Sequence, residues 1–277
     1  MNKIILFVSL FLSWGTIQAQ NLTVASFNIR LKTDSDIGNL WSDRKHAVTD
    51  LIAYHQFDIF GVQEAFHEQL TDMKNQLKGY QYIGVGRDDG ALQGEHSAIF
   101  FNTSRFKAVK SGTFWLSNTD TEKPNKGWDA VLPRICSWGV FEDVENGKRF
   151  IFMNTHFDHV GVEARKESAK LILAKAKELA NNLPLILTGY FNVYQNNDAY
   201  FTLANSGIVQ DIYKKAPLKY EPNSTFNGWG KSLKKDSRID HIFISPPFQV
   251  KKYGILTDTY MGKFPSDHFP VVGHLSW

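Results

Sequence analysis

The segment 183–192, L-P-L-I-L-T-G-Y-F-N, is the stretch from which the fold is best inferred. Its apolar part, residues 185–188, ends abruptly at Gly189, and the polar residues Tyr190 and Asn192 follow at once. A short apolar run bounded by turn residues is typical of a buried strand. Proteins of the α/β class place their chemistry where such strands end. The segment therefore predicts a central strand that delivers side chains to a functional sheet edge.

The N-terminal residues have the composition of an export signal. Lys3 is followed by an apolar run over residues 4–12, and the small residue Ala19 closes the segment. This is the pattern of a secretory signal peptide, and its apolar run is too short to span a bilayer. We predict a signal peptide over residues 1–19, a single domain over residues 20–277, export to the periplasm or the exterior, and no stable membrane anchor.

The composition favours a globular domain with an ordinary core. The 277 residues are 43% apolar and include one cysteine, Cys136, so an intrachain disulfide is excluded. The formal net charge of +3 is too small to indicate a nucleic-acid-binding protein. Lysines and arginines are concentrated in residues 211–263. A solvated basic face is the favoured interpretation of that segment, and a patch that attracts an anionic substrate is the alternative.

Strand patterns and helix patterns interleave along the chain without a linker of biased composition. Strands are expected at 22–29, 58–64, 80–85, 98–101, 106–116, 135–144, 149–154, 185–188, 238–245, 249–256 and 271–275. Helices are expected at 43–52 with Ser42 as the N-cap, at 67–77, at 162–179 and near 198–204. Asn146 and Gly147, between two apolar runs, predict a β-hairpin. The segment 117–133 has neither period and is expected to form a long surface loop.

Short polar motifs stand near the ends of several predicted strands. They are S-F-N-I-R at 26–30, V-Q-E at 62–64, N-T-H at 154–156, T-G-Y-F-N at 188–192, R-I-D at 238–240 and S-D-H at 266–268. In this order they resemble the endonuclease/exonuclease/phosphatase superfamily, the DNase I-like metal-dependent phosphoesterases, over nearly the whole domain. The resemblance implies an α/β fold, a DNase I-like four-layer sandwich in which helices flank two packed β-sheets.

A metal site is expected at one end of this motif set. Glu64 follows an apolar strand, and its carboxylate suits a hard divalent cation such as Mg²⁺ or Mn²⁺. The resemblance implies that Asn28 lies near the same metal or the scissile phosphate, and that Asp267 is a further carboxylate beside the metal. Without the other motifs, the favoured interpretation of Glu64 is a solvated surface group. The corresponding interpretation of Asn28 is a residue that caps a turn.

The resemblance also implies two histidine sites. Asp240 and His268 resemble the superfamily's Asp–His pair, in which the carboxylate fixes the imidazole tautomer and favours its protonated form. His156 resembles the second histidine of the DNase I-like branch, and Glu95 stands where that branch places its partner carboxylate. Asn192 is expected to donate a hydrogen bond to the substrate. A purely structural pairing of these side chains is the alternative.

Tyr190 departs from the family pattern. The superfamily signature that 188–192 resembles is T-G-D-F-N, and its Asp positions or deprotonates the attacking water. A phenol titrates near pH ~10 against about 4 for Asp, so Tyr190 cannot act as a base at neutral pH. General-base help is worth about 10²–10⁴ in rate. The sequence therefore predicts weak activity or none.

Asp158 and Arg165 are candidates for substrate contacts. They belong to the run H-F-D-H-V-G-V-E-A-R at 156–165, which resembles an exported bacterial branch of the superfamily. Asp158 lies two residues after His156, so both side chains would face the same side if the strand continued. Asp158 would then be a substitute base. An equally favoured alternative is that Asp158 only precedes the next helix and that Arg165 is solvated.

The first function hypothesis is a metal-dependent phosphoester hydrolase with impaired activity, acting as a monomer on nucleic acid, a phospholipid headgroup or a small phosphodiester. The second is an inactive phosphoester-binding protein on the same fold. In a third, Tyr190 is a substitution and the natural protein has Asp. Loops 117–133 and 220–235 are expected to decide the substrate, because function resides in what the loops add to a shared core.

Overall fold

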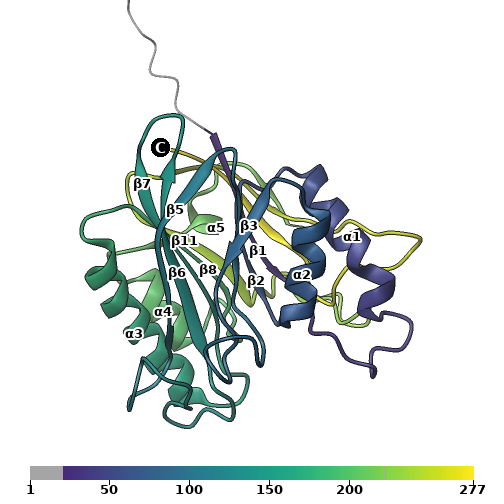
Figure 1. Cartoon of the computed structure of the whole chain (residues 1–277), viewed down its shortest axis with the longest axis horizontal. Helices are drawn as coiled ribbons and strands as arrows, with labels where there is room; N and C mark the ends of the chain where they lie inside the picture. The colour runs from purple at the N-terminus through teal and green to yellow at the C-terminus, as the bar shows by residue number, and fades with distance from the viewer. Residues whose placement is uncertain (1–20, 222) are drawn as a thin grey trace, which may run out of the picture.

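The computed structural model describes residues 21–221 and 223–277 (Figure 1). The predicted signal peptide over residues 1–19 lies outside the described residues. Within them, no helix is both long enough and apolar enough to cross a membrane.

Two β-sheets form the centre of the molecule. The strands of the first sheet are β1 (Asn21–Asn28), β2 (Ile59–Gln63), β3 (Tyr80–Ile83), β4 (Ile99–Asn102), β10 (Lys219–Tyr220), β12 (Gln249–Ile255) and β13 (Val271–Ser276). Their order is β10-β12-β13-β1-β2-β4-β3. The strands of the second sheet are β5 (Phe106–Trp115), β6 (Ile135–Asp143), β7 (Arg149–His156), β8 (Leu185–Tyr190), β9 (Gln210–Asp211) and β11 (Asp240–Ile244). Their order is β5-β6-β7-β8-β11-β9.

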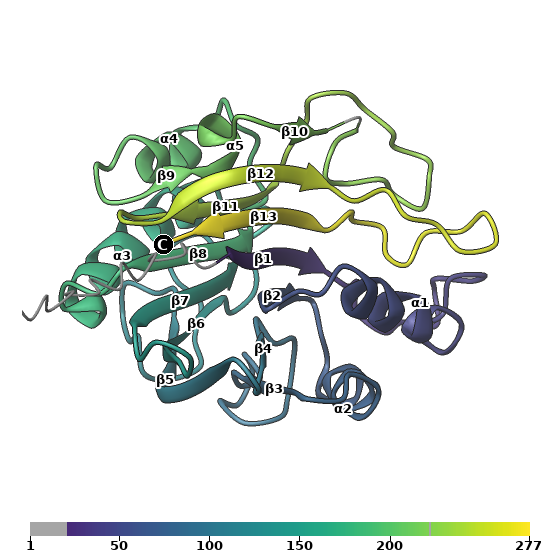
Figure 2. The ribbon, with the colours of Figure 1, turned by 90° about the horizontal axis from the view of Figure 1, so that it is seen from above.

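Helices cover the outer face of each sheet. They are α1 (Trp41–Tyr54), α2 (His67–Gln76), α3 (Val162–Ala180) and α4 (Asp198–Ala204). The short α5 (Ile212–Lys215) instead contributes Ile212 to the core between the sheets. Figure 1 shows α1 and α2 on one side of the molecule and α3 and α4 on the other, and Figure 2 shows the two sheets facing each other. One apolar cluster fills the space between the sheets, and two more lie under the helix pairs. The predicted four-layer α/β sandwich is confirmed.

The register around β8 places three candidate site residues side by side. β8 pairs with β7 in parallel and with β11 in antiparallel orientation, so Tyr190 lies opposite both His156 and Asp240. Residues directly opposite each other on neighbouring strands share a face of the sheet. The strand extends through Tyr190, two residues beyond the predicted end at Thr188, because both neighbouring strands pair with it to that point.

The start of α1 corrects a prediction. The helix begins at Trp41 with Leu40 at the N-cap, so Ser42 lies in the first turn, and its hydroxyl donates to the carboxylate of Asp43. The buried Trp41 donates its indole N–H to Asp72 of α2 at 2.9 Å. Tertiary packing therefore sets the start of this helix in place of a capping side chain. The short elements β9, α5 and β10 were not predicted, since two to four residues carry no readable period.

His241 is a structural histidine that follows the site residue Asp240. Because side chains alternate along β11, its ring faces away from Asp240 and packs against Phe191 and Tyr200. Burial lowers the pKa of His241 to about 4 from an ordinary value of 6.5. The unfolded chain therefore takes up a proton below pH 6.5 that the folded chain accepts only near pH 4.

The free energy of unfolding is accordingly expected to fall by about 3 kcal/mol through His241 as the pH falls from 6.5 to 4. Urea unfolding of the chain and of His241→Gln at pH 7 and pH 4.5 measures this contribution. The difference in stability between the two should shrink or reverse at the lower pH. A difference that does not change with pH would show that His241 is not a buried neutral group.

Candidate active site

Tyr190 lies at the centre of the candidate site. Its ring stacks on His156, with centroids 4.7 Å apart at 26°, and meets the ring of His268 edge-on at 4.6 Å and 65°. Burial, together with the negative charges of Asp240 and Glu64, raises the pKa of the Tyr190 phenol. The phenol is therefore neutral throughout the physiological range. The prediction that Tyr190 points among these side chains agrees with the geometry.

Asp240 and His268 form a buried ion pair on one side of Tyr190. His268 Nδ1 donates to Asp240 Oδ2 at 2.9 Å, and both side chains are almost inaccessible to solvent. Burial alone would lower the pKa of His268, but the charge and hydrogen bond of Asp240 outweigh burial and raise it to about 9. At neutral pH His268 is an imidazolium whose Nε2–H can donate to an anion.

His156 lies on the opposite face of the Tyr190 ring. Its Nδ1 is 3.4 Å from Glu95 Oε2, and Asn192 places its amide nitrogen 3.3 Å from His156 Nε2. Asn192 has a left-handed backbone with φ of 53°, and its amide also donates to the carbonyl of Phe157 at 2.9 Å. Burial and the positive charge of Arg134 lower the pKa of His156 well below 6.5. The site thus contains one neutral and one charged imidazole.

Asn28, Glu64 and Asp267 meet at the acidic end of the site. Asn28 donates from its amide to Glu64 Oε1 at 2.8 Å, and Glu64 adopts a left-handed backbone with φ of 64°. The guanidinium of Arg30 lies 3.7 Å from Glu64 Oε2 and 3.8 Å from Asp267 Oδ2. Arg30 makes its direct hydrogen bonds to Asp36 instead, at 2.9 and 3.1 Å. Both carboxylates therefore lie near the same guanidinium, but neither accepts a hydrogen bond from Arg30.

The donors at this end fit one hard divalent cation. Burial and the nearby Glu64 raise the pKa of Asp267, against the opposing effect of the positive charges of His268 and Arg30. Mg²⁺ is commonly bound by one or two carboxylates while it keeps several waters. Across residues 21–221 and 223–277, no cluster of three or more His, Cys, Asp or Glu side chains has a metal-binding arrangement.

Asp158 lies beside the site, and Arg165 contacts its backbone. Asp158 Oδ1 accepts from the amides of Val160 and Gly161, and its Oδ2 lies 3.4 Å from Arg134 Nε. Burial opposes ionisation of Asp158, but these amides and Arg134 outweigh it and lower its pKa to about 2. Arg165 donates to the Asp158 carbonyl at 3.0 Å. Strand β7 ends at His156, so the continued strand considered for Asp158 does not form.

Arg30, Arg87 and Arg134 are charged site residues that the sequence interpretation missed. Arg87 Nη1 lies 2.9 Å from Glu95 Oε2, and Arg134 Nη1 lies 4.0 Å from the same oxygen. Both guanidinium groups are buried. Arg30 belongs to the S-F-N-I-R motif and could have been singled out. Arg87 and Arg134 stand in or next to irregular loops, where no local pattern marks them.

Two pairs of a histidine and a carboxylate therefore lie near the ends of strands β7, β8 and β11. The sequence model of the Endonuclease/Exonuclease/phosphatase family matches residues 25–268. The chain belongs to this family, whose members hydrolyse phosphoesters.

Solved structures from Bacteroides resemble the chain over most of its length. A family member from Bacteroides thetaiotaomicron is 50% identical and has a TM-score of 0.91, with 94% of this chain and 99% of that chain covered. A mannosyl-6-phosphatase of the same species is 51% identical with a TM-score of 0.90, over 92% of this chain and 100% of that one. A family member from Bacteroides vulgatus is 38% identical with a TM-score of 0.88, over 92% and 98%.

Proposed function

We propose that the chain is a metal-dependent phosphoester hydrolase whose rate is limited by Tyr190. The observation that carries this proposal is the set of groups around the Tyr190 ring. His156 and His268 both contact the ring, with centroids less than 5 Å from that of the phenol. Asp240 lies directly opposite Tyr190 on β11. Asn192 also contacts His156, and the signature that 188–192 resembles has an Asp where this chain has Tyr190.

The side chains of the site have separate roles toward a bound phosphate. His268, held as an imidazolium by Asp240, donates from Nε2 to a phosphoryl oxygen. The Asn192 amide is held by its bond to the Phe157 carbonyl and contacts Nε2 of His156, so it positions that imidazole. Glu64 and Asp267, with Asn28, would hold a divalent cation, which supplies charge neutralisation on the phosphoryl oxygens.

The attacking water lacks a base. Tyr190 is neutral, larger than Asp and occupies the position between the two histidines. Asp158 is a poor substitute because its pKa is about 2 and its oxygens already accept hydrogen bonds from backbone amides. Hydrolysis should therefore proceed, but slowly.

A phosphorylated sugar is the proposed substrate class. The support is the 51% identity to a mannosyl-6-phosphatase over 92% of this chain. A sugar phosphate is a small monoester, a class that adds to the nucleic acid, phospholipid headgroup and small phosphodiester expected from the sequence.

A phosphoester-binding protein without turnover is the second candidate. Tyr190 favours it, because the ring fills space between the imidazoles and brings no negative charge. Such a protein would bind sugar phosphates and release them unchanged.

Release of phosphate from mannose 6-phosphate and a panel of monoesters, and release of the leaving alcohol from a panel of diesters, with Mn²⁺ or with EDTA, tests the proposal. We expect slow hydrolysis that requires Mn²⁺. Glu64→Gln should lower the rate at least about 10-fold and weaken Mn²⁺ binding in calorimetry, because one of the cation's charged ligands is lost. Glu68→Gln, an exposed glutamate on α2, is the matched control and should change neither.

Two results would contradict the proposal. Binding of mannose 6-phosphate without any release of phosphate would favour the binding protein. Equal Mn²⁺ affinity in the chain and in Glu64→Gln would remove Glu64 from the metal site.

A further inference from the structure

Arg44 of α1 is a fully buried arginine. Within residues 21–221 and 223–277, every hydrogen bond of its guanidinium goes to a backbone carbonyl. Nε donates to Asn39 at 3.1 Å, Nη1 donates to Ile29 and, at 3.2 Å, to Pro265, and Nη2 donates to Arg30 at 2.8 Å. A buried charge is costly unless hydrogen bonds compensate it, so the guanidinium and these carbonyls hold one another in place.

Two indole rings enclose this guanidinium. Its central carbon lies 5.0 Å from the centroid of the Trp41 ring and 5.4 Å from that of the Trp229 ring. Contacts of a cation with aromatic faces stabilise the cation where water is excluded. Trp229 belongs to a loop in which the amides of residues 227 and 228 donate to the Asp267 carbonyl at 2.8 and 3.0 Å. The Arg44 side chain therefore lies where this loop meets the segment around Asp267.

The carbonyls that Arg44 binds flank two residues of the acidic end of the site. Residues 29 and 30 directly follow Asn28, and residue 265 stands two positions before Asp267. These two segments also contact each other, because the Ser266 hydroxyl donates to the Asn28 carbonyl at 2.7 Å across 238 positions of the sequence. Arg44 and Ser266 thus connect the S-F-N-I-R motif to the S-D-H motif.

The segment after Asn28 contains a strained turn that Arg44 supports from both sides. Arg30 has a left-handed backbone with φ of 58°, which is uncommon for a residue with a long side chain. Arg44 donates to the carbonyl that precedes Arg30 and to the carbonyl of Arg30 itself. The turn brings the amide of Leu31 to 3.3 Å from Glu64 Oε2, while the Asn28 amide donates to Glu64 Oε1. Strained backbone persists only where its surroundings hold it, so the Glu64 carboxylate depends on this support.

We propose that Arg44 is a positioning residue for the metal site, which fixes Asn28, Glu64 and Asp267 relative to one another without contacting the ion. The proposal rests on the proposed function, because the divalent cation assigned there gives these three side chains a common role. Groups behind the ligands commonly change metal affinity by about 10–100-fold when they are replaced. A lysine cannot replace Arg44, because an ammonium has three donors at one point and lacks the planar fork that reaches separate carbonyls.

Calorimetric titration with Mn²⁺ tests this role. Arg44→Lys keeps the charge but loses the fork, and Arg44→Met loses both, so each should weaken Mn²⁺ binding at least about 10-fold. The matched control is Arg105→Met, which removes a mostly buried arginine that lies 2.6 Å from Asp58, at the other end of β2 from Glu64. The control should also unfold at lower urea concentration, but it should keep the Mn²⁺ affinity of the parent.

A milder variant covers the case in which the Arg44 variants do not fold. Trp229→Leu removes one enclosing ring and leaves the hydrogen bonds of the guanidinium in place. It should weaken Mn²⁺ binding in the same direction, by about threefold, because the loss of one cation–π contact is a smaller change. Parent-like Mn²⁺ affinity in Trp229→Leu, with Arg44 variants that do not fold, would overturn the proposal.

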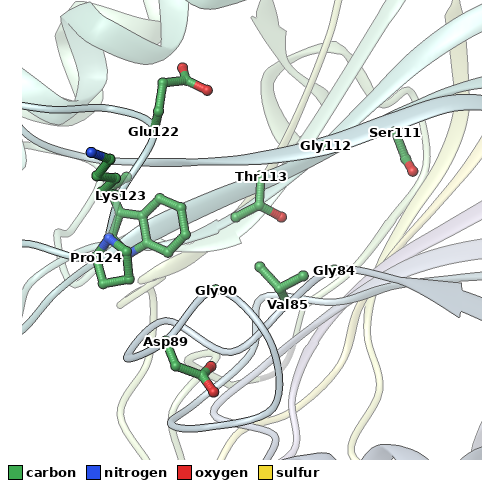
Figure 3. A pocket seen from close by; sticks show the side chains of 11 residues that line it. Gly84, Val85, Asp89, Gly90, Ser111, Gly112, Thr113, Glu122, Lys123 and Pro124 are labelled. Atoms are coloured by element: carbon green, nitrogen blue, oxygen red, sulfur yellow. The ribbon is translucent and has the colours of Figure 1, made fainter.

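Amide hydrogen exchange of the metal-free protein provides a second measurement that needs no ion. The amides of Arg30 and Leu31 are bonded to the side chains of Asn28 and Glu64, and peptides that contain them should exchange at least about 10-fold faster in Arg44→Lys. Strand β5 is the internal reference. It lines the cavity of about 560 Å³ in Figure 3 and lies three strands from β8, so its exchange should match that of the parent.

The outcomes separate this proposal from the proposed function. Faster exchange around Arg30 with unchanged Mn²⁺ affinity would show that Arg44 only stabilises the loops, and it would overturn the positioning role while leaving the metal site standing. Parent-like affinity in Arg44→Lys, with a loss only in Arg44→Met, would assign the effect to charge and overturn it too. An equal loss in Arg105→Met would assign it to general destabilisation. Absence of Mn²⁺ binding by the parent would contradict the metal-dependent function and this role together.

Discussion

Tyr190→Asp is expected to raise kcat/KM for a phosphomonoester by on the order of 10²-fold or more in the presence of Mn²⁺. The substitution places a carboxylate between His156 and His268, where the stacked phenol now lies. It also vacates volume for water and phosphate. Rates measured with saturating Mn²⁺, before and after addition of EDTA, give the size of the gain and its dependence on metal.

The controls for this prediction separate charge from volume. Tyr190→Asn has nearly the same shape as Tyr190→Asp without the charge, and it should recover only a small part of the gain. Tyr194→Asp adds a carboxylate at an exposed tyrosine four residues away and should leave the rate unchanged. If Tyr190→Asp and the parent hydrolyse the same substrate equally fast, another group serves as the base and the assignment of Tyr190 as the limiting residue is wrong.

His268→Asn in the Tyr190→Asp background is expected to lower the rate by about 10²–10⁴. The substitution removes an imidazolium whose pKa is raised to about 9 and whose Nε2–H is the proposed donor to the phosphate. His274→Asn, an exposed histidine on β13, is the control and should have no effect. A rate within threefold of the Tyr190→Asp protein would show that His268 does not act on the substrate.

This experiment needs a check of folding, because His268 and Asp240 are both buried. Breaking a buried ion pair by removing one partner typically costs about 3–5 kcal/mol. The His268→Asn protein should therefore unfold at lower urea concentration while keeping the circular dichroism of the parent at zero urea. Loss of activity with a retained spectrum then reports the chemistry of His268.

The strand pattern around Tyr190 was predictable because it depends on local chemistry. An apolar β-branched run that ends in glycine defines β8, and β8 alone places Tyr190 at the sheet edge. Asp240 and His268 are 28 residues apart, and their pairing was predicted from the family motifs rather than from spacing. Asp240 pairs with His268 and not with His241, the next residue along the chain. Side chains alternate along β11, so the His241 ring faces the core.

Other features depend on tertiary contacts that no single segment encodes. Arg87 and Arg134 meet Glu95 from separate loops, so neither position carries a periodic signal. The start of α1 is set by the contact of Trp41 with Asp72, which overrides the favourable capping residue Ser42. Strand β7 ends at His156, and the chain then turns to begin α3. The backbone amides of that turn, such as that of Val160, donate to the Asp158 carboxylate.

The most direct test of the claim that Tyr190 obstructs an otherwise complete phosphate site is the affinity for inorganic phosphate. Calorimetric titration in the presence of Mn²⁺ compares the chain with Tyr190→Ala, and it requires no turnover. Tyr190→Ala should bind phosphate at least about 10-fold more tightly than the parent, equivalent to about 1.4 kcal/mol. The combination of Tyr190→Ala with His268→Ala should lose that gain. Equal affinity in the parent and in Tyr190→Ala, or no phosphate binding by either, would contradict the account.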